Sequence, residues 1–120
     1  MSYKLAVNQK NKILNVTLTG KLTKLDIFSL ALNARSYIKD DSVRKVIVDL
    51  RECAGRLNLF DSLDLAGSYP EYLKEFQIAI LDIEENIEKS RMHEKIAHNR
   101  GFSIVCFTKQ EEAEAWLENN

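Results

Sequence analysis

The stretch VIVDLRECAGRLNLFDS, residues 46–62, contains the transition on which the fold of this chain depends. It begins with a short apolar run that is rich in β-branched residues. No polar residues alternate with them, and this pattern is typical of a central strand covered on both faces. Gly55 interrupts the stretch, and an Asp-Ser pair at its end is suited to the start of a helix. A strand, a loop and a helix in this order predict an α/β protein with its candidate site in the loop.

The flanking sequence extends this pattern in both directions. Two further apolar runs, FQIAILDI and FSIVCF, follow it, and a helical pattern comes after each of them. Alternating apolar residues over 3–9 and 14–18 predict an antiparallel hairpin, and the capping box Thr23-Lys24-Leu25-Asp26 starts a helix over about residues 24–39. The predicted order is ββαβαβαβα, which gives an α/β fold with a mixed, mostly parallel five-stranded sheet, an N-terminal β-hairpin and helices packed on the sheet.

Composition narrows the classes of protein to which the chain can belong. Its 120 residues predict a single domain over 1–120, and 17 basic against 18 acidic residues leave a net charge of −1. This balance gives no basic footprint for nucleic acid. We expect no stable membrane insertion, because no apolar run is long enough to span a bilayer. Cys53 and Cys106 form no CxxC motif, which predicts free thiols and a cytoplasmic protein.

The motifs of common catalytic and cofactor sites are missing from the sequence. It contains no GxSxG, GxGxxG or phosphate-binding loop, so we expect no enzyme and no cofactor. His93 and His98 are five residues apart and would face different sides of a helix, which predicts two surface residues and no metal site. Cys53, close to Arg51 and Arg56, leaves an alternative interpretation in which a thiol of lowered pKa is catalytic.

Two segments of the chain carry a family resemblance. A hairpin that ends in LTGKLT, followed by a helix and by VRKVIVDL, resembles the STAS domain of bacterial anti-sigma-factor antagonists. The segment EKIAHNRGFSIVCFTKQEEAEAWL closely resembles the C-terminal part of the SpoIIAA-like (STAS/SEC14-type) family of small bacterial proteins. The resemblance extends from about Lys12 to Leu117 and implies a single STAS-like domain with a non-enzymatic regulatory role.

The resemblance also implies a candidate site. In the antagonists, a strand ending in Asp-Leu leads to an Asp-Ser-Ser-Gly motif, and phosphorylation of a serine there by a partner kinase controls binding. Asp49-Leu50 matches the strand end and Asp61-Ser62 the start of the helix, with Leu63-Asp64 in place of Ser-Gly. A protein partner would then dock on the loop and helix after the third strand. The residues assigned to partner binding or phosphorylation are Arg51, Arg56, Asn58, Asp61 and Ser62.

Other interpretations of the same loop stay open. Asn58 or Asp61 is then only a helix cap, and the two arginines are solvated. The SEC14-like side of the family name implies instead a small apolar ligand or lipid. Leu57, Leu59 and Phe60 would form the lip of a cavity of roughly 300 Å³ or more, although a helix start also needs apolar anchors and two of the three are expected to pack inward. A homodimer through an edge strand in residues 3–9, or through the apolar side of a helix, is a further alternative.

Overall fold

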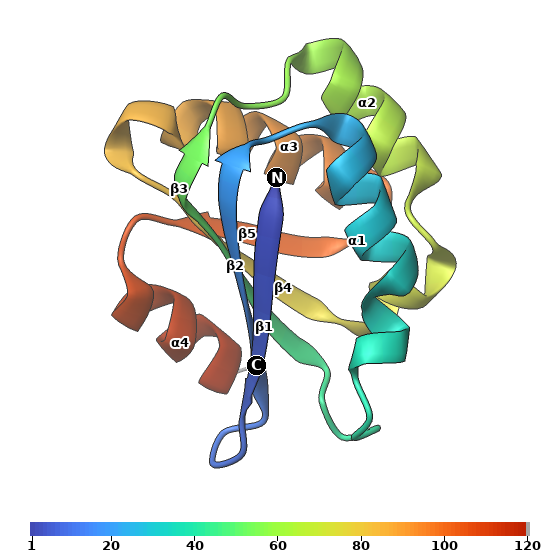
Figure 1. Ribbon diagram of the computed structural model, residues 1–120, viewed down its shortest axis with the longest axis vertical. Coiled ribbons are helices and arrows are strands. Elements are labelled where there is room, and N and C mark those ends of the chain that lie inside the picture. The colour runs from blue at the N-terminus through green and yellow to red at the C-terminus, as the bar shows by residue number, and fades with distance from the viewer. Residues whose placement is uncertain (120) are drawn as a thin grey trace.

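The structure, a computed structural model, describes residues 1–119 and has the predicted order of elements (Figure 1). The strands are β1 (Ser2–Asn8), β2 (Ile13–Lys21), β3 (Lys45–Ala54), β4 (Gln77–Leu81) and β5 (Ser103–Phe107). The helices are α1 (Lys24–Tyr37), α2 (Leu59–Ser68), α3 (Ile87–Asn99) and α4 (Gln110–Glu118), with short 3₁₀ helices η1 (Glu71–Glu75) and η2 (Glu84–Asn86). The predicted α/β fold with a mixed, mostly parallel sheet is confirmed.

The strands lie in the sheet in the order in which they occur in the chain, β1-β2-β3-β4-β5. Strands β1 and β2 form the antiparallel hairpin, and every later pair is parallel. The carboxyl ends of the parallel strands therefore lie along one edge of the sheet. Figure 1 shows the arrowheads of β2 and β3 at the top, where the chain turns into α1 and α2.

Helices cover both faces of this sheet. Helices α1, α2 and α3 lie on one face and α4 lies on the other (Figure 1). Alternate residues of β2 divide between the two cores: Leu14 and Val16 face α1–α3, whereas Ile13 packs with Ala113 and Leu117 of α4. Since β3 and β4 are covered on both sides, their sequences are apolar without alternation.

The helices differ in how closely they pack on the sheet. Helix α3 buries four residues and α4 buries Ala113 and Leu117, but α1 buries none. Apolar residues surround α1: Leu30 is half-buried on its inner side, while Leu25 and Leu32 are 72% and 50% exposed. Helix α1 therefore lies over the sheet without closing tightly on it.

Candidate functional site

The loop between β3 and α2 lies at the carboxyl edge of the sheet. Gly55 has a φ of +76°, in the left-handed region that glycine adopts easily, and the chain turns there. Asn58 caps α2, because its Oδ1 accepts a hydrogen bond from the backbone N–H of Asp61 at 2.8 Å. The carboxylate of Asp61 lies in the first turn, near the positive end of the helix dipole. Asn58 thus has the capping role, and Asp61 supports it.

A buried ion pair joins this loop to the end of β4. The side chain of Arg56 is 3% exposed and that of Asp82 is 0% exposed. Arg56 Nε donates to Asp82 Oδ2 at 2.9 Å, and Arg56 Nη2 donates to Asp82 Oδ1 at 2.6 Å. This is the two-pronged geometry that suits a guanidinium and a carboxylate.

The other donors of Arg56 are also occupied. Its Nη2 donates to the carbonyl of Leu50, and its Nη1 donates to the carbonyls of Cys53 and Gly55. All five N–H groups of the guanidinium thus have acceptors within the protein. Arg56 is therefore neither solvated nor free to bind a phosphate, contrary to both expectations, because Asp82, directly after β4, is its buried partner.

Asp82 accepts two further hydrogen bonds. Ser90 Oγ donates to its Oδ2 at 2.6 Å, and the N–H of Ile83 donates to its Oδ1 at 2.8 Å. Burial alone raises the pKa of Asp82, but the hydrogen bonds from Arg56, Ser90 and Ile83 outweigh it, so the pKa is lowered. The hydrogen bond to Asp82 raises the pKa of Arg56. The pair stays ionised and fastens the β3–α2 loop to β4 and α3.

Arg51 lies in a different environment. Its side chain is 42% exposed, and its Nε and Nη2 donate to the two carboxylate oxygens of Asp49 at 3.0 and 2.9 Å. The hydrogen bond to Asp49 raises the pKa of Arg51. Arg51 therefore remains at the surface, where its charge is already paired within β3.

Ser62 is wholly buried. Its exposed fraction is 0%, and its Oγ has no hydrogen-bond partner within residues 1–119. Because α2 begins at Leu59, Ser62 faces inward with Leu65 and Ala66. A kinase reaches this hydroxyl only if α2 leaves its packed position. The resemblance to a phosphorylated serine at an open helix start therefore does not extend to the geometry.

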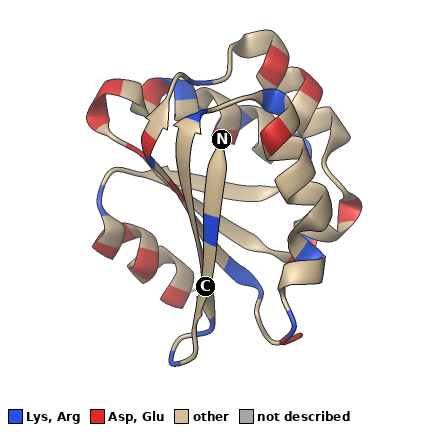
Figure 2. Cartoon of the chain, viewed as in Figure 1, with Lys and Arg blue, Asp and Glu red and all other residues tan. Residues whose placement is uncertain are grey.

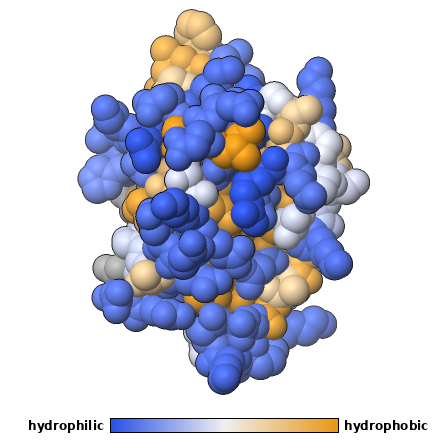
Figure 3. Space-filling view, turned by 90° about the vertical axis from the view of Figure 1, so that its left-hand side faces the viewer, coloured by the Kyte–Doolittle hydropathy of each residue, from blue (hydrophilic) through white to orange (hydrophobic). Residues whose placement is uncertain are grey.

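The apolar residues of the loop divide between the interior and the surface. Leu57 is half-buried against the core, whereas Leu59 is 48% and Phe60 78% exposed. Leu63, one turn further along α2, is 42% exposed. Two of the three loop residues thus point outward, contrary to the expectation that two pack inward. Apolar side chains project at this end of the molecule in Figure 3.

The thiols and imidazoles agree with the expectations in part: Cys53 and Cys106 are free and His98 is at the surface, whereas His93 is not. Burial raises the pKa of the Cys53 thiol, opposite in direction to the alternative in which this pKa is lowered, and burial likewise raises the pKa of Cys106. His98 is exposed, but His93 is buried, its Nε2 lies 2.7 Å from Tyr69 Oη, and burial lowers its pKa to about 4. Within residues 1–119 no cluster of three His, Cys, Asp or Glu side chains could hold a metal ion.

The sequence pattern did not indicate that Asp82 pairs with Arg56, that Ser90 bonds to Asp82, or that Tyr69 contacts His93. The available signal was a single acidic residue directly after the apolar run QIAIL, at the same edge as the β3–α2 loop. A carboxylate in such a position requires a cationic partner, and Arg56 is the nearest cation in a neighbouring loop.

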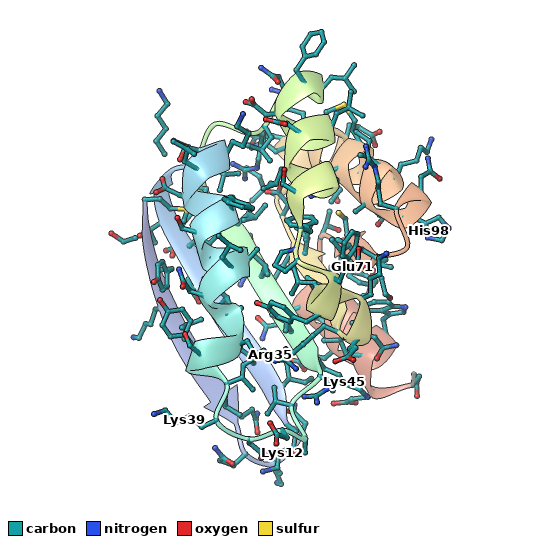
Figure 4. The ribbon with its side chains drawn as sticks, turned by 90° about the vertical axis from the view of Figure 1, so that its right-hand side faces the viewer. Lys12, Arg35, Lys39, Lys45, Glu71 and His98 are labelled. Atoms are coloured by element: carbon teal, nitrogen blue, oxygen red, sulfur yellow. The ribbon has the colours of Figure 1, made fainter. Side chains whose placement is uncertain are left out.

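Charge is distributed unevenly over the molecule. Lys12, Arg35, Lys39 and Lys45 lie at the end opposite the start of α2 (Figure 4), and Lys12 pairs with Asp40 at 2.9 Å. Acidic residues are prominent on α2 and α4 (Figure 2). Basic residues also lie at the end where α2 begins, and three of them, Lys24, Arg51 and Arg56, are paired with acidic residues of the chain.

Comparison with known proteins identifies the fold. No family model matches the chain, and no curated protein matches it. An uncharacterized DUF3478-family protein with a SpoIIAA-like fold from Shewanella loihica has 22% identity and a TM-score of 0.62, and the match covers 97% of this chain and 92% of that one. An anti-sigma factor antagonist from Mycobacterium paratuberculosis has 13% identity and a TM-score of 0.53, with 97% and 94% covered. The SpoIIAA-like fold expected from the resemblance is confirmed.

The helices show no membrane span. Among residues 1–119 no helix combines the length and the apolar character that are needed to cross a bilayer.

Proposed function

We propose that this chain is a non-enzymatic regulatory module that binds a protein partner through an apolar surface at the start of α2. This surface, the α2 patch, consists of Leu25, Leu59, Phe60 and Leu63. The observation that supports it best is the 78% exposure of Phe60, since a large aromatic side chain left in water at the start of a well-capped helix calls for a reason. The fold shared with an anti-sigma factor antagonist supports a regulatory role.

The α2 patch stands on a rigid base. The Asn58 cap and the buried Arg56–Asp82 pair hold the start of α2 in place. Lys24 Nζ lies 2.6 Å from Asp64 Oδ2, which ties α1 to α2 and brings Leu25 next to α2. A surface that is already ordered loses little conformational entropy on binding. The patch is therefore suited to docking without rearrangement.

The charged residues around the α2 patch are paired within the chain, so we expect a partner to be held mainly by apolar contact. Lys24 is paired with Asp64 and Arg51 with Asp49, so these charges are compensated within the chain. Aromatic side chains contribute much of the binding energy at protein interfaces when they insert into a pocket of the partner. We expect a partner with an apolar pocket for Phe60.

The test first identifies the partner and then measures its affinity for variants of the α2 patch. A photo-crosslinking residue at position 60, in cells that naturally produce the protein, should capture the partner, whereas the same residue at Leu32, which is 50% exposed on α1, should not. The purified partner is then titrated by calorimetry. Phe60→Ser should weaken binding at least about tenfold, as expected for a central aromatic contact, and Leu32→Ser should change it less than about twofold.

Two results would contradict the proposal. Equal losses in Phe60→Ser and Leu32→Ser would show that the α2 patch is not the binding surface. Flotation of the wild-type protein with liposomes, abolished by Phe60→Ser, would assign the patch to a membrane surface and not to a protein.

A further inference from the structure

A cavity lies between the sheet and helices α1–α3. Its volume is about 140 Å³. Its wall is almost entirely apolar: Leu30 and Ala34 of α1 face Val16, Val48 and Ile80 of the sheet. The cavity accounts for the absence of a fully buried residue on α1. Its volume is below that expected for a lipid but close to the roughly 150 Å³ of an engineered apolar cavity that binds benzene.

His93 is the polar group in this wall that lacks a second partner. It lines the cavity and is 7% exposed, and its Nδ1 has no hydrogen-bond partner within residues 1–119. Burial lowers the pKa of His93 to about 4, so its ring is neutral at pH 7. A buried ring nitrogen without a partner is uncommon in folded proteins and calls for an explanation.

The contact with Tyr69 decides which ring nitrogen of His93 carries the proton. Tyr69 Oη lies 2.7 Å from His93 Nε2, and burial raises the pKa of Tyr69, so the phenol keeps its proton. Its hydrogen has no other acceptor among the described residues, and Tyr69 therefore donates to Nε2. A neutral imidazole that accepts at Nε2 carries its own proton on Nδ1. Nδ1–H is thus a buried donor without an acceptor.

We propose that this cavity binds a small, uncharged apolar molecule with one hydrogen-bond acceptor, such as the carbonyl of a ketone or ester, which accepts from His93 Nδ1–H. The other polar side chains in the wall are donors: Arg56 and Ser90 donate to Asp82, and Lys89 carries an ammonium. Since Arg56 and Ser90 already give these hydrogens to Asp82, they offer none to a ligand, and His93 Nδ1–H is the buried donor that an acceptor on the ligand would complement. An anion is disfavoured, because burying a charge against an apolar wall is costly and Arg56 is already neutralised.

This site is separate from the α2 patch, and neither proposal depends on the other. The side chains of Phe60 and Leu59 point away from the interior, whereas the cavity lies beneath α1. The chain would therefore have two binding surfaces, one for a protein and one for a small molecule.

Two ligands of similar size test the proposal, cyclohexanone and cyclohexane, titrated into the full chain and followed by NMR of the backbone amides. The wild type should bind both. His93→Phe keeps a ring in the wall but removes the donor, so its affinity for cyclohexanone should fall at least fivefold while that for cyclohexane stays within twofold. Ala34→Phe places a ring in the cavity and should abolish the binding of both ligands.

A second measurement requires no substitution. The ¹⁵N chemical shifts of the His93 ring in the wild-type protein should place the proton on Nδ1, and the Nδ1 resonance should move on addition of cyclohexanone but not of cyclohexane. Three results would overturn the proposal: neither ligand binds, Nε2 carries the proton, or His93→Phe weakens the binding of both ligands equally.

Discussion

The two faces of the sheet are covered in different ways. On one face, α4 has 9 residues and buries Ala113 and Leu117 completely. On the other, α1 has 14 residues and buries none of them. In α4 the two buried residues are four apart and most of their neighbours are charged, whereas apolar residues surround α1. The spacing of apolar residues, more than their number, therefore decides how closely a helix packs.

Polar contacts supplement apolar packing on the α1 face, which also holds the larger of the two apolar cores. The Arg56–Asp82 pair, the Tyr69–His93 contact and the hydrogen bond from the Tyr72 hydroxyl to the carbonyl of Ala31 all lie on this side of the sheet. The α4 face holds together through apolar side chains such as Ile13, Leu81 and Leu117. Both candidate sites lie on the α1 face, where packing leaves room for them.

Removal of the buried ion pair should have the largest effect. Arg56→Ala leaves Asp82 buried without its cation, and we expect the free energy of unfolding to fall by about 4 kcal/mol. Urea denaturation measures this change. The control is Arg51→Ala, which breaks an exposed pair and should lower stability by less than about 0.5 kcal/mol. Similar losses in the two variants would show that the α1 face does not depend on its buried polar contacts.

Truncation of one leucine on each face compares their packing directly. Leu117→Ala opens a void in a fully buried position and should lower the free energy of unfolding by about 3 kcal/mol. Leu30→Ala enlarges a cavity that already exists and should lower it by only about 1 kcal/mol. The same urea titration gives both values. A loss as large for Leu30→Ala as for Leu117→Ala would mean that α1 packs as tightly as α4.

The protein should also lose stability in mild acid, because His93 is buried on the α1 face. The pKa of His93 is lowered from 6.5 to about 4 in the folded protein, so between these values the unfolded chain binds more protons than the folded one. Stability therefore falls as the pH falls through this window, by about 2 kcal/mol between pH 7 and pH 5. The stabilisation by Asp82, whose pKa is lowered from 3.8, is lost only at still lower pH. His93→Gln should abolish the loss between pH 7 and 5, and His98→Gln should retain it.

The smallest effect is expected at the α2 patch. Phe60 is 78% exposed, so Phe60→Ser should change the free energy of unfolding by less than about 0.5 kcal/mol. Thermal and urea denaturation check this value. A larger loss would show that Phe60 supports the fold, and the interpretation of its binding defect would then change.

The fold could be predicted from short stretches of sequence, because apolar residues recur at a different spacing in strands and in helices. The alternation in β2 indicated one mainly apolar face, with Ile13 as the exception that packs against α4, and the unbroken apolar run of β3 indicated a strand covered on both faces. The sequence left Asn58 and Asp61 as alternative caps of α2, and the structure shows that Asn58 is the cap. Such features depend on residues that are neighbours in the chain.

The site was harder to predict, because it depends on residues that are distant in the chain. Nothing close to Arg56 in sequence indicates that its partner is Asp82, and nothing close to His93 indicates that it is buried against Tyr69. Ser62 matched a motif by residue type, but the position at which α2 begins turned its hydroxyl inward. Helical phase and strand register, which sequence leaves uncertain by a residue or two, decide such cases.

The strand order β1-β2-β3-β4-β5 has a consequence for synthesis on the ribosome. Each nascent strand finds its partner already made, so the sheet can grow in the direction in which the chain emerges. Helix α4 follows all five strands, and until it docks, Ile13, Ile47 and Leu81 lie on an uncovered apolar face. A chain that stalls before Gln110 would therefore carry a nearly complete sheet with one exposed apolar face. Chaperones bind exposed apolar surface of this kind.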